Sequence, residues 1–323
     1  MKPGSMRDRF HGVLLGTAMG DALGMPVEGA PMDAIQERFG ELREMKEARL
    51  GRGTVTDDTH MTLALAEALA STPDAVDLDV VADRFAARFR PERGYGGNAR
   101  VILSEIRSGI PWRDAVERHR LPGGSWANGA AMRVAPVALA FLGRRDRVAD
   151  AAVAQAKVTG HEHPVGTDGA RLQALAVHSA VSLGDPLEPL PFVEELERHG
   201  EPWHPEVARA LRWVRTHLDA EPEEAARNLG TGARASQSVP AALWAFLSVE
   251  GGAQESVVRA VNLGGDTDTV GAMAGALAGA WNGASAFPSS WMEALEGGAM
   301  GADGLRAAAD ALYRTSPGRS DAR

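Results

Sequence analysis

The stretch GGDTDTVGAMAGALAG, residues 264–279, joins a flexible entry to two acidic side chains and an almost wholly small and apolar helix. Two glycines loosen the backbone. Asp266, Asp268 and Thr269 follow at the predicted helix N-terminus, where side-chain oxygens cap free N–H groups. The later residues are nearly all Gly, Ala, Met, Leu or Val. We therefore expect a buried helix that packs very close to its neighbours and suits a cation at its N-terminal end.

A second stretch with the same plan lies upstream, where Thr56, Asp57, Asp58 and Thr59 precede HMTLALAEALA. Either stretch alone is explained by capping and by the helix dipole, which favours acidic residues at an N-terminus. Together they supply four carboxylates, and two like charges about 4 Å apart repel by roughly 4 kcal/mol at an effective dielectric near 20. If the two helix ends meet, Mg²⁺ or Mn²⁺ would remove this conflict, because both ions prefer oxygen ligands.

The composition excludes several classes of protein. Hydrophobic residues make up 44% of the 323 residues but aromatic residues only 5%, which favours close helix packing over a β-sandwich. A formal charge of −9 argues against a broad nucleic-acid-binding face. The chain has no cysteine, so a disulfide framework, a thiolate zinc site and a cysteine nucleophile are excluded. Any metal must be held by oxygen or imidazole.

The beginning of the chain has the charge order of a signal peptide, since Arg7 and Arg9 precede the largely apolar segment 13–24. Asp21 interrupts that segment, however, and no small-residue cleavage site follows. The longest apolar stretches fall short of the roughly 18 residues needed to span a bilayer. We therefore expect a cytoplasmic protein.

Apolar residues recur at helical spacing along nearly the whole chain. The charged segment 31–53 is expected to be irregular, Asn128 is expected to cap a helix, and residues 314–323 are expected to be a frayed tail. With almost no credible strand and no linker, the sequence predicts one all-α domain over residues 1–323. The predicted helices cover 10–23, 59–71, 76–89, 94–108, a segment from 111, 129–142, 147–159, 166–183, shorter segments up to 229, 239–249 and 254–261.

Six segments carry a resemblance to a known family. They are GTAMGDALGMPVEG (16–29), TDDTHMTLALAEAL (56–69), GYGGNAR (94–100), SWANGAAMRVAP (125–136), HEHP (161–164) and NLGGDTDTVGAMAGALAGA (262–280). On these segments the chain resembles, over nearly its full length, the ADP-ribosylglycohydrolase family, which includes the dinitrogenase-reductase-activating glycohydrolase and the ADP-ribosyl-acceptor hydrolases. The resemblance implies an all-α fold with two Mg²⁺ or Mn²⁺ ions at helix N-termini.

The resemblance also implies roles for particular residues. Glu28, Asp58 and Asp268 would be catalytic, and Glu28 would accept or relay a proton near the reacting ribose. Without the resemblance, Glu28 could be a surface carboxylate, Trp126 could fill the core and His161 could close a turn. The implied metal ligands are Thr56, Asp57, Asp58, Asp266, Asp268 and Thr269, and the implied substrate-binding residues are Gly94, Asn98, Ser125, Trp126, Asn128, Gly129 and His161.

The expected function is metal-dependent hydrolysis of the glycosidic bond between ADP-ribose and an acceptor, with arginine on a protein as the leading acceptor. Serine-linked, O-acetylated or nucleic-acid-linked ADP-ribose would use the same ribose and diphosphate contacts. Two further alternatives are a two-metal phosphohydrolase acting on a nucleotide diphosphate and a non-catalytic ADP-ribose-binding protein. The expected partners are ADP-ribosylated proteins or small ADP-ribose conjugates, and the chain is expected to be a monomer.

Overall fold

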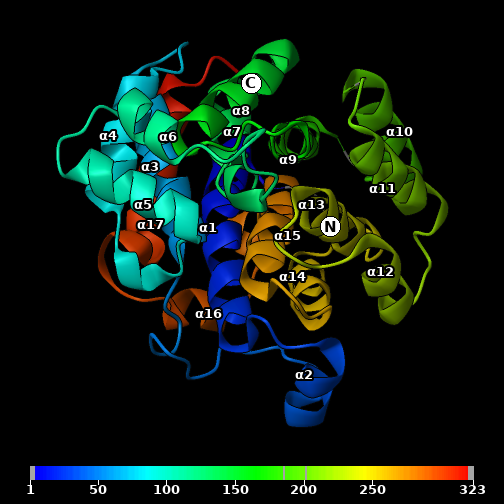
Figure 1. Ribbon diagram of the computed structural model, residues 1–323. Coiled ribbons are helices and arrows are strands. Elements are labelled where there is room, and N and C mark those ends of the chain that lie inside the picture. The colour runs from blue at the N-terminus through cyan, green and yellow to red at the C-terminus, as the bar shows by residue number, and fades with distance from the viewer. Residues whose placement is uncertain (1–3, 185, 201, 319–323) are drawn as a thin grey trace.

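The computed structural model describes residues 4–184, 186–200 and 202–318, and within these ranges it contains helices but no strand, which confirms the all-α prediction (Figure 1). Two isolated bridges, between Pro31 and Gly264 and between Ala127 and Arg234, are the only sheet-like pairings there. No helix in the described ranges is long and apolar enough to cross a membrane. The α-helices are α1 (Met6–Gly24), α2 (Met32–Phe39), α3 (Asp57–Ser71), α4 (Leu78–Arg88), α5 (Gly97–Arg107), α6 (Trp112–His119), α7 (Ala135–Ala140), α8 (Arg145–Ala156), α9 (Pro164–Ser182), α10 (Pro189–Gly200), α11 (Pro205–Thr216), α12 (Pro222–Leu229), α13 (Ala235–Leu247), α14 (Ala253–Asn262), α15 (Thr267–Asn282), α16 (Ser289–Ala294) and α17 (Ala302–Thr315).

The centre of the fold is an antiparallel pair, α1 and α15, whose backbones touch through glycines (Figure 1). A Cβ atom on Gly12, Gly16 or Gly20 would lie 2.3, 2.1 or 2.0 Å from the carbonyl oxygens of Gly279, Gly275 and Gly271. No side chain fits at such distances, so the close packing expected of the helix at 267–282 is confirmed. The matching glycine spacing of α1 was not anticipated.

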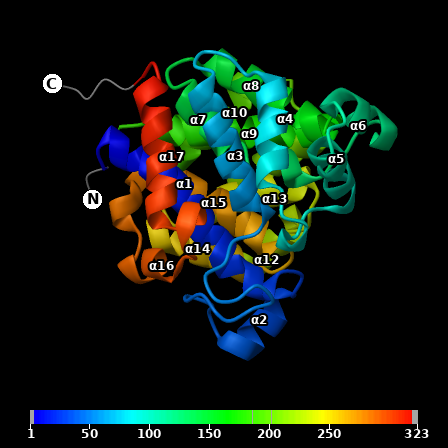
Figure 2. The ribbon, with the colours of Figure 1, turned by 90° about the vertical axis from the view of Figure 1, so that its left-hand side faces the viewer.

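This contact places the C-terminal end of α1 beside the N-terminal end of α15. A Cβ on Gly24 would lie 2.3 Å from the carbonyl oxygen of Thr267, and the Thr267 hydroxyl donates to the Gly24 carbonyl at 2.8 Å. The remaining helices surround the pair. α13, α14 and α9 pack against α15, whereas α3 and α17 pack against α1 (Figure 2).

Three segments differ from the sequence-based expectation. The segment 31–53 contains α2, which is anchored by the buried side chain of Ile35. The predicted helix 129–142 is instead a 3₁₀ turn, Asn128–Ala130, followed by α7. Pro136 stands in the first turn of α7 and has no N–H to bond the carbonyl four residues earlier, so a continuous helix would lose a hydrogen bond there.

The predicted frayed tail also differs at its beginning. α17 continues through Thr315, and the next residue, Ser316, is buried and donates its hydroxyl to the Leu139 carbonyl at 2.8 Å. This hydrogen bond ties the end of α17 to α7. The last five residues of the predicted tail, 319–323, lie outside the described residues.

We expect Gly16→Ala to lower the free energy of unfolding by at least about 2–3 kcal/mol, because the new methyl group would force the two backbones apart. Gly97→Ala is the matched control, since no atom lies within 4 Å of its added Cβ, and it should change stability by no more than about 1 kcal/mol. Denaturant unfolding measures both variants. Equal stabilities for the two variants would contradict the role given to the glycine contact.

Candidate active site

The N-terminal ends of α3 and α15 open into one cavity of about 630 Å³. Its volume lies within the range typical of small-molecule sites. Two predicted site residues, Thr56 and Trp126, are not part of its wall. The predicted site residues that line it are Glu28, Asp57, Asp58, Gly94, Asn98, Ser125, Asn128, Gly129, His161, Asp266, Asp268 and Thr269. The two acidic stretches, more than 200 residues apart in the sequence, therefore face the same space.

At the α3 end, Thr56 is the N-cap residue and is fully buried. Its hydroxyl oxygen accepts from the Asp58 backbone N–H and lies 3.3 Å from the Asp58 Oδ2, to which it can donate. Asp57 and Asp58 follow in the first turn and are both buried in the wall of the cavity. Thr56 thus acts on the cavity through Asp58.

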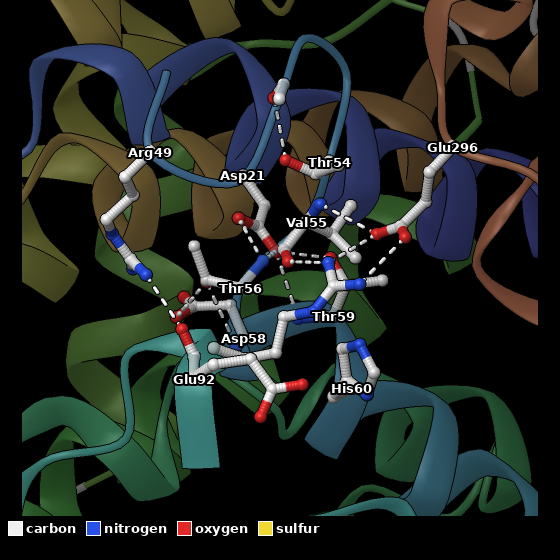
Figure 3. A network of polar contacts seen from close by, with 12 residues as sticks. Asp21, Arg49, Thr54, Val55, Thr56, Asp58, Thr59, His60, Glu92 and Glu296 are labelled. Carbon is white, nitrogen blue, oxygen red and sulfur yellow. Dashed lines mark hydrogen bonds and ion pairs between the residues drawn. The ribbon is translucent and has the colours of Figure 1, made fainter. Parts of the chain in front are cut away.

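A residue that the sequence analysis missed, Asp21 of α1, holds this end of α3 in place (Figure 3). Its carboxylate accepts from the Thr56 N–H at 3.0 Å, from the Thr59 N–H at 3.1 Å and from the Thr59 hydroxyl at 2.5 Å. Asp21 is fully buried, and burial raises its pKa to about 6 although these hydrogen bonds oppose the shift. The available signal was a single acidic residue inside the otherwise largely apolar segment 13–24.

At the α15 end, Asp266 is the N-cap residue but its side chain caps no helical N–H. Instead, its Oδ2 accepts from the Asn128 amide at 2.6 Å, and Asn128 also donates to the Ser238 hydroxyl. Asn128 is therefore not the helix cap that the sequence predicted, because its amide is used to orient Asp266. Asp268 is buried, and its Oδ1 accepts from the Thr269 N–H at 2.9 Å.

The buried acids resist ionisation. Burial is the largest cause that raises the pKa values of Asp58 and Asp268 far above the usual range, and mutual repulsion across the two helix ends adds to it. The pKa of Asp57 rises to about 8 for the same reasons, with Asp21 the first of its charged neighbours. The Thr269 hydroxyl opposes the shift of the Asp58 pKa. The two helix ends therefore act electrostatically as one site.

A divalent cation fits this donor set. The Asp58 Oδ1 is buried and has no hydrogen-bond partner among the described residues, so an acceptor atom is available beside three other carboxylates. Among the described residues, no group of three or more Asp, Glu or His side chains is arranged to hold a metal ion without other ligands. Hydroxyl, backbone or water oxygens would have to complete the coordination, as is usual for Mg²⁺.

Glu28 stands at the mouth of the cavity, just after the 3₁₀ turn Met25–Val27. Its side chain is 42% exposed, and its Oε2 lies 3.7 Å from the Arg49 guanidinium, which also donates to the Glu92 carbonyl. Partial burial and the charge of Asp266 raise the pKa of Glu28, whereas Arg49 opposes the shift. Glu28 is the most accessible of the acidic groups and is suited to exchange protons with a substrate.

Two further parts of the cavity wall are loops with little side-chain bulk. Gly94 has a positive φ of 106°, and a Cβ there would lie 3.1 Å from the Asp57 Oδ1. A Cβ on Gly129 would lie 2.7 Å from the His161 Nε2. Trp126 stands outside the cavity wall, 45% exposed, with the Arg234 guanidinium 5.0 Å above its ring. It neither fills the core nor faces the acidic end.

The chain is an all-α domain in which two acidic helix ends open into one cavity, and comparisons with known proteins identify its family. The ADP-ribosylglycohydrolase family profile matches residues 2–322. The mouse ADP-ribosylhydrolase ARH3 is 32% identical, with 90% of this chain and 88% of the relative covered. The ADP-ribosyl-[dinitrogen reductase] glycohydrolase of Rhodospirillum rubrum is 30% identical, with 90% and 92% covered.

A solved structure, described as an ADP-ribosylglycohydrolase-related protein complex, has a TM-score of 0.74 and 34% identity, and the match covers 97% of this chain and 99% of that one. The chain belongs to the ADP-ribosylglycohydrolase family. Its relatives are named as ADP-ribosylhydrolases and glycohydrolases, and this chain is an enzyme of the same class. The resemblance seen in the six sequence segments is thus confirmed.

The raised pKa values predict how pH affects the protein without metal. An acid whose pKa is raised in the folded state stabilises the fold fully below its ordinary pKa of 3.8, and this stability is lost as pH rises through the folded value, about 6 for Asp21 and about 8 for Asp57. We expect the melting temperature in chelator to fall from pH 5.5 to pH 8.5. Added Mn²⁺ should raise it more at pH 8.5 than at pH 5.5, because protons then compete less.

Asp57→Asn is the variant that checks this assignment. The asparagine cannot ionise, so the melting temperature of the variant in chelator should fall less steeply over the same pH range. Thermal unfolding followed by circular dichroism measures both proteins. A melting temperature that does not fall with pH in the unmodified protein would contradict the electrostatic description of the site.

Asp21→Asn is expected to weaken the metal site. An amide NH₂ cannot accept from the Thr56 and Thr59 donors, so the start of α3 should be held less firmly and the α3 ligands should bind Mn²⁺ less tightly. The matched control is Asp33→Asn, because Asp33 is exposed on α2 and its carboxylate accepts from the neighbouring Ala34 N–H. Mn²⁺ titrations that do not separate the two variants would disprove this role.

Proposed function

We propose that this enzyme hydrolyses the glycosidic bond between ADP-ribose and an acceptor on a protein, with release of free ADP-ribose, and that the reaction requires divalent ions. The observation that supports this most directly is the meeting of the two acidic helix ends, α3 and α15, in one cavity large enough for a nucleotide-sized ligand. The membership of the chain in the ADP-ribosylglycohydrolase family supplies the reaction class.

The residues that would hold two Mg²⁺ or Mn²⁺ ions are Thr56, Asp57, Asp58, Asp266, Asp268 and Thr269. These ions would supply Lewis acidity and positive charge beside the reacting ribose. Asn128 contributes by donating to Asp266, and Asp21 contributes by holding Thr56. The Thr56 hydroxyl and the Asn128 amide each contact the Oδ2 of an aspartate, Asp58 and Asp266 respectively. The Asp58 Oδ1 has no hydrogen-bond partner among the described residues and could bind a metal ion.

The chain itself supplies the proton acceptor and the shape of the site. Glu28 is in reach of solvent at the cavity mouth, and its raised pKa brings it closer to neutral pH, where a general base works best. Asp58 and Asp268 are the deepest acids and orient the reacting end of the ligand. Gly94, Asn98, Ser125, Gly129 and His161 line the path along which the rest of ADP-ribose would extend. The exposed face of Trp126 would contact the ligand or its carrier outside the cavity.

We propose arginine as the acceptor. The name of the Rhodospirillum rubrum relative states that it acts on ADP-ribosylated dinitrogen reductase, a protein substrate. An accessible carboxylate at the cavity mouth, Glu28, suits a cationic guanidinium leaving group. ADP-ribosylated proteins are the proposed partners, and the expectations of a cytoplasmic location and of a monomer stay predictions.

Product analysis on matched arginine-linked and serine-linked ADP-ribosyl peptides, with Mg²⁺, with Mn²⁺ and with chelator, tests the proposal. We expect free ADP-ribose only in the presence of metal, and faster release from the arginine-linked peptide. Faster release from the serine-linked peptide would correct the acceptor. AMP as product would favour a phosphohydrolase, and binding of ADP-ribose without turnover would favour a non-catalytic role.

Asp58→Asn and Asp268→Asn should each reduce metal-dependent turnover at least about 100-fold, because each substitution removes a carboxylate that we propose as a ligand of the divalent ions. Neither variant should be less stable than the unmodified protein in chelator, since the lost charge is one that the fold disfavours. Measured together, the rate and the melting temperature separate loss of chemistry from loss of fold. Full activity in both variants would overturn the assignment.

A further inference from the structure

A fully buried arginine, Arg133, lies in the wall of the cavity, near enough to Asp57 for the charge of that carboxylate to oppose the effect of burial on its pKa. Arg133 has no exposed surface, yet no carboxylate among the described residues accepts a hydrogen bond from it. Its guanidinium donates to the Gln155 side chain at 2.7 Å, to the Gln155 carbonyl at 3.2 Å and to the Thr159 hydroxyl at 2.9 Å, and it packs on the Phe85 ring. Burial lowers its pKa to about 9, which leaves it charged at neutral pH.

The direction of the hydrogen bond from Arg133 limits the roles that the Thr159 hydroxyl can take. A guanidinium can only donate, so the Thr159 oxygen must accept from Arg133. The hydroxyl proton is then available to another acceptor, and the His161 Nδ1 lies 2.9 Å from the same oxygen. Thr159 is fully buried, so water does not compete for this proton. The arrangement favours an Nδ1 that accepts, which leaves the proton of a neutral ring on Nε2.

His161 is held neutral and faces the cavity. Burial, followed by the charge of Arg133, lowers its pKa to about 3. The Thr159 carbonyl also lies near the ring and favours its protonated form, but within the described chain the contact with hydrogen-bond geometry is the one to the hydroxyl. The ring lines the cavity beside Gly129, where an added Cβ would lie 2.7 Å from the Nε2, so only a glycine lets the backbone pass this close to the ring.

We propose that Arg133, acting through Thr159, locks His161 in the neutral tautomer that carries its proton on Nε2, and that this N–H donates to an anionic oxygen of ADP-ribose. The inference rests on the proposed function for the identity of the ligand. The positive charge beneath the ring and the donor above it both favour an anion, and the diphosphate is the anionic part of ADP-ribose. Thr159 and Arg133 are thus positioning residues.

The tautomer is measured directly by long-range ¹H–¹⁵N correlation spectra of the ligand-free protein at pH 7.5. The chain has nine histidines, so His161→Asn identifies the signals of His161 by their loss. We expect the pattern of a neutral ring protonated on Nε2. Thr159→Ser should keep this pattern, whereas Thr159→Val, which lacks the hydroxyl, should give a mixture of tautomers or the Nδ1-protonated form.

Calorimetric titration of ADP-ribose into the same proteins tests the consequence. Thr159→Val should bind ADP-ribose about tenfold more weakly and Thr159→Ser about as well as the unmodified protein, since one oriented hydrogen bond to a charged group is removed in the first case only. Thr62→Val is the matched control, because Thr62 is also buried but its hydroxyl has no partner in the described residues.

A proton on Nδ1 in the unmodified protein would overturn the proposal, as would a Thr159→Val variant with an unchanged tautomer and unchanged affinity. If Thr159→Val fails to fold, the spectra of the unmodified protein and of Thr159→Ser still decide. The spectra of the free protein require no catalysis. A failure of the proposed hydrolysis would therefore leave the tautomer result intact, and an incorrect tautomer would leave the hydrolysis result intact.

Discussion

The backbone contact between α1 and α15 is the constraint on which the rest of the structure depends. Glycines at every fourth position of both helices bring carbonyl oxygens to distances at which no side chain would fit. A slip of four residues would move one helix by roughly 6 Å along the other. Such a slip would separate the Gly24 end of α1 from the Thr267 end of α15, and with it Asp21 and Glu28 from Asp266 and Asp268. The site therefore depends on the register of this pair.

The register brings together groups that would otherwise avoid one another. Asp57, Asp58 and Asp268 are buried near further acids, and burial with like charge raises their pKa values. Asp21 adds to this repulsion, but its carboxylate also accepts three donors at the start of α3 and so holds that helix end in place. Structure and proposed function meet here, since an arrangement that disfavours charge in the free protein is one that binds cations well.

The wall of the cavity carries charges of both signs. Carboxylates occupy the ends of α3 and α15, and a buried cation, Arg133, lies in the wall close to both Asp57 and His161. ADP-ribose has a corresponding division, because its distal ribose offers neutral hydroxyls and its diphosphate is anionic. In the proposed function, such a ligand would place its distal ribose near the acids that we propose as metal ligands and its diphosphate near His161.

The sequence by itself determined the all-α class, the two acidic helix ends, the family and most of the residues that line the cavity. These features are local, because small-residue helices, caps and short motifs are written in consecutive residues. It missed Asp21, since one acid in an apolar helix has no meaning until α3 is packed beside it. It also assigned Asn128 to a helix cap, because the competing partner, Asp266, is distant in sequence. Only the tertiary structure decided that α3 and α15 share a cavity and that Trp126 lies outside it. It also decided that Arg133 reaches His161 through Thr159. Each of these facts depends on how distant segments pack against one another, and the local sequence of a segment does not determine that.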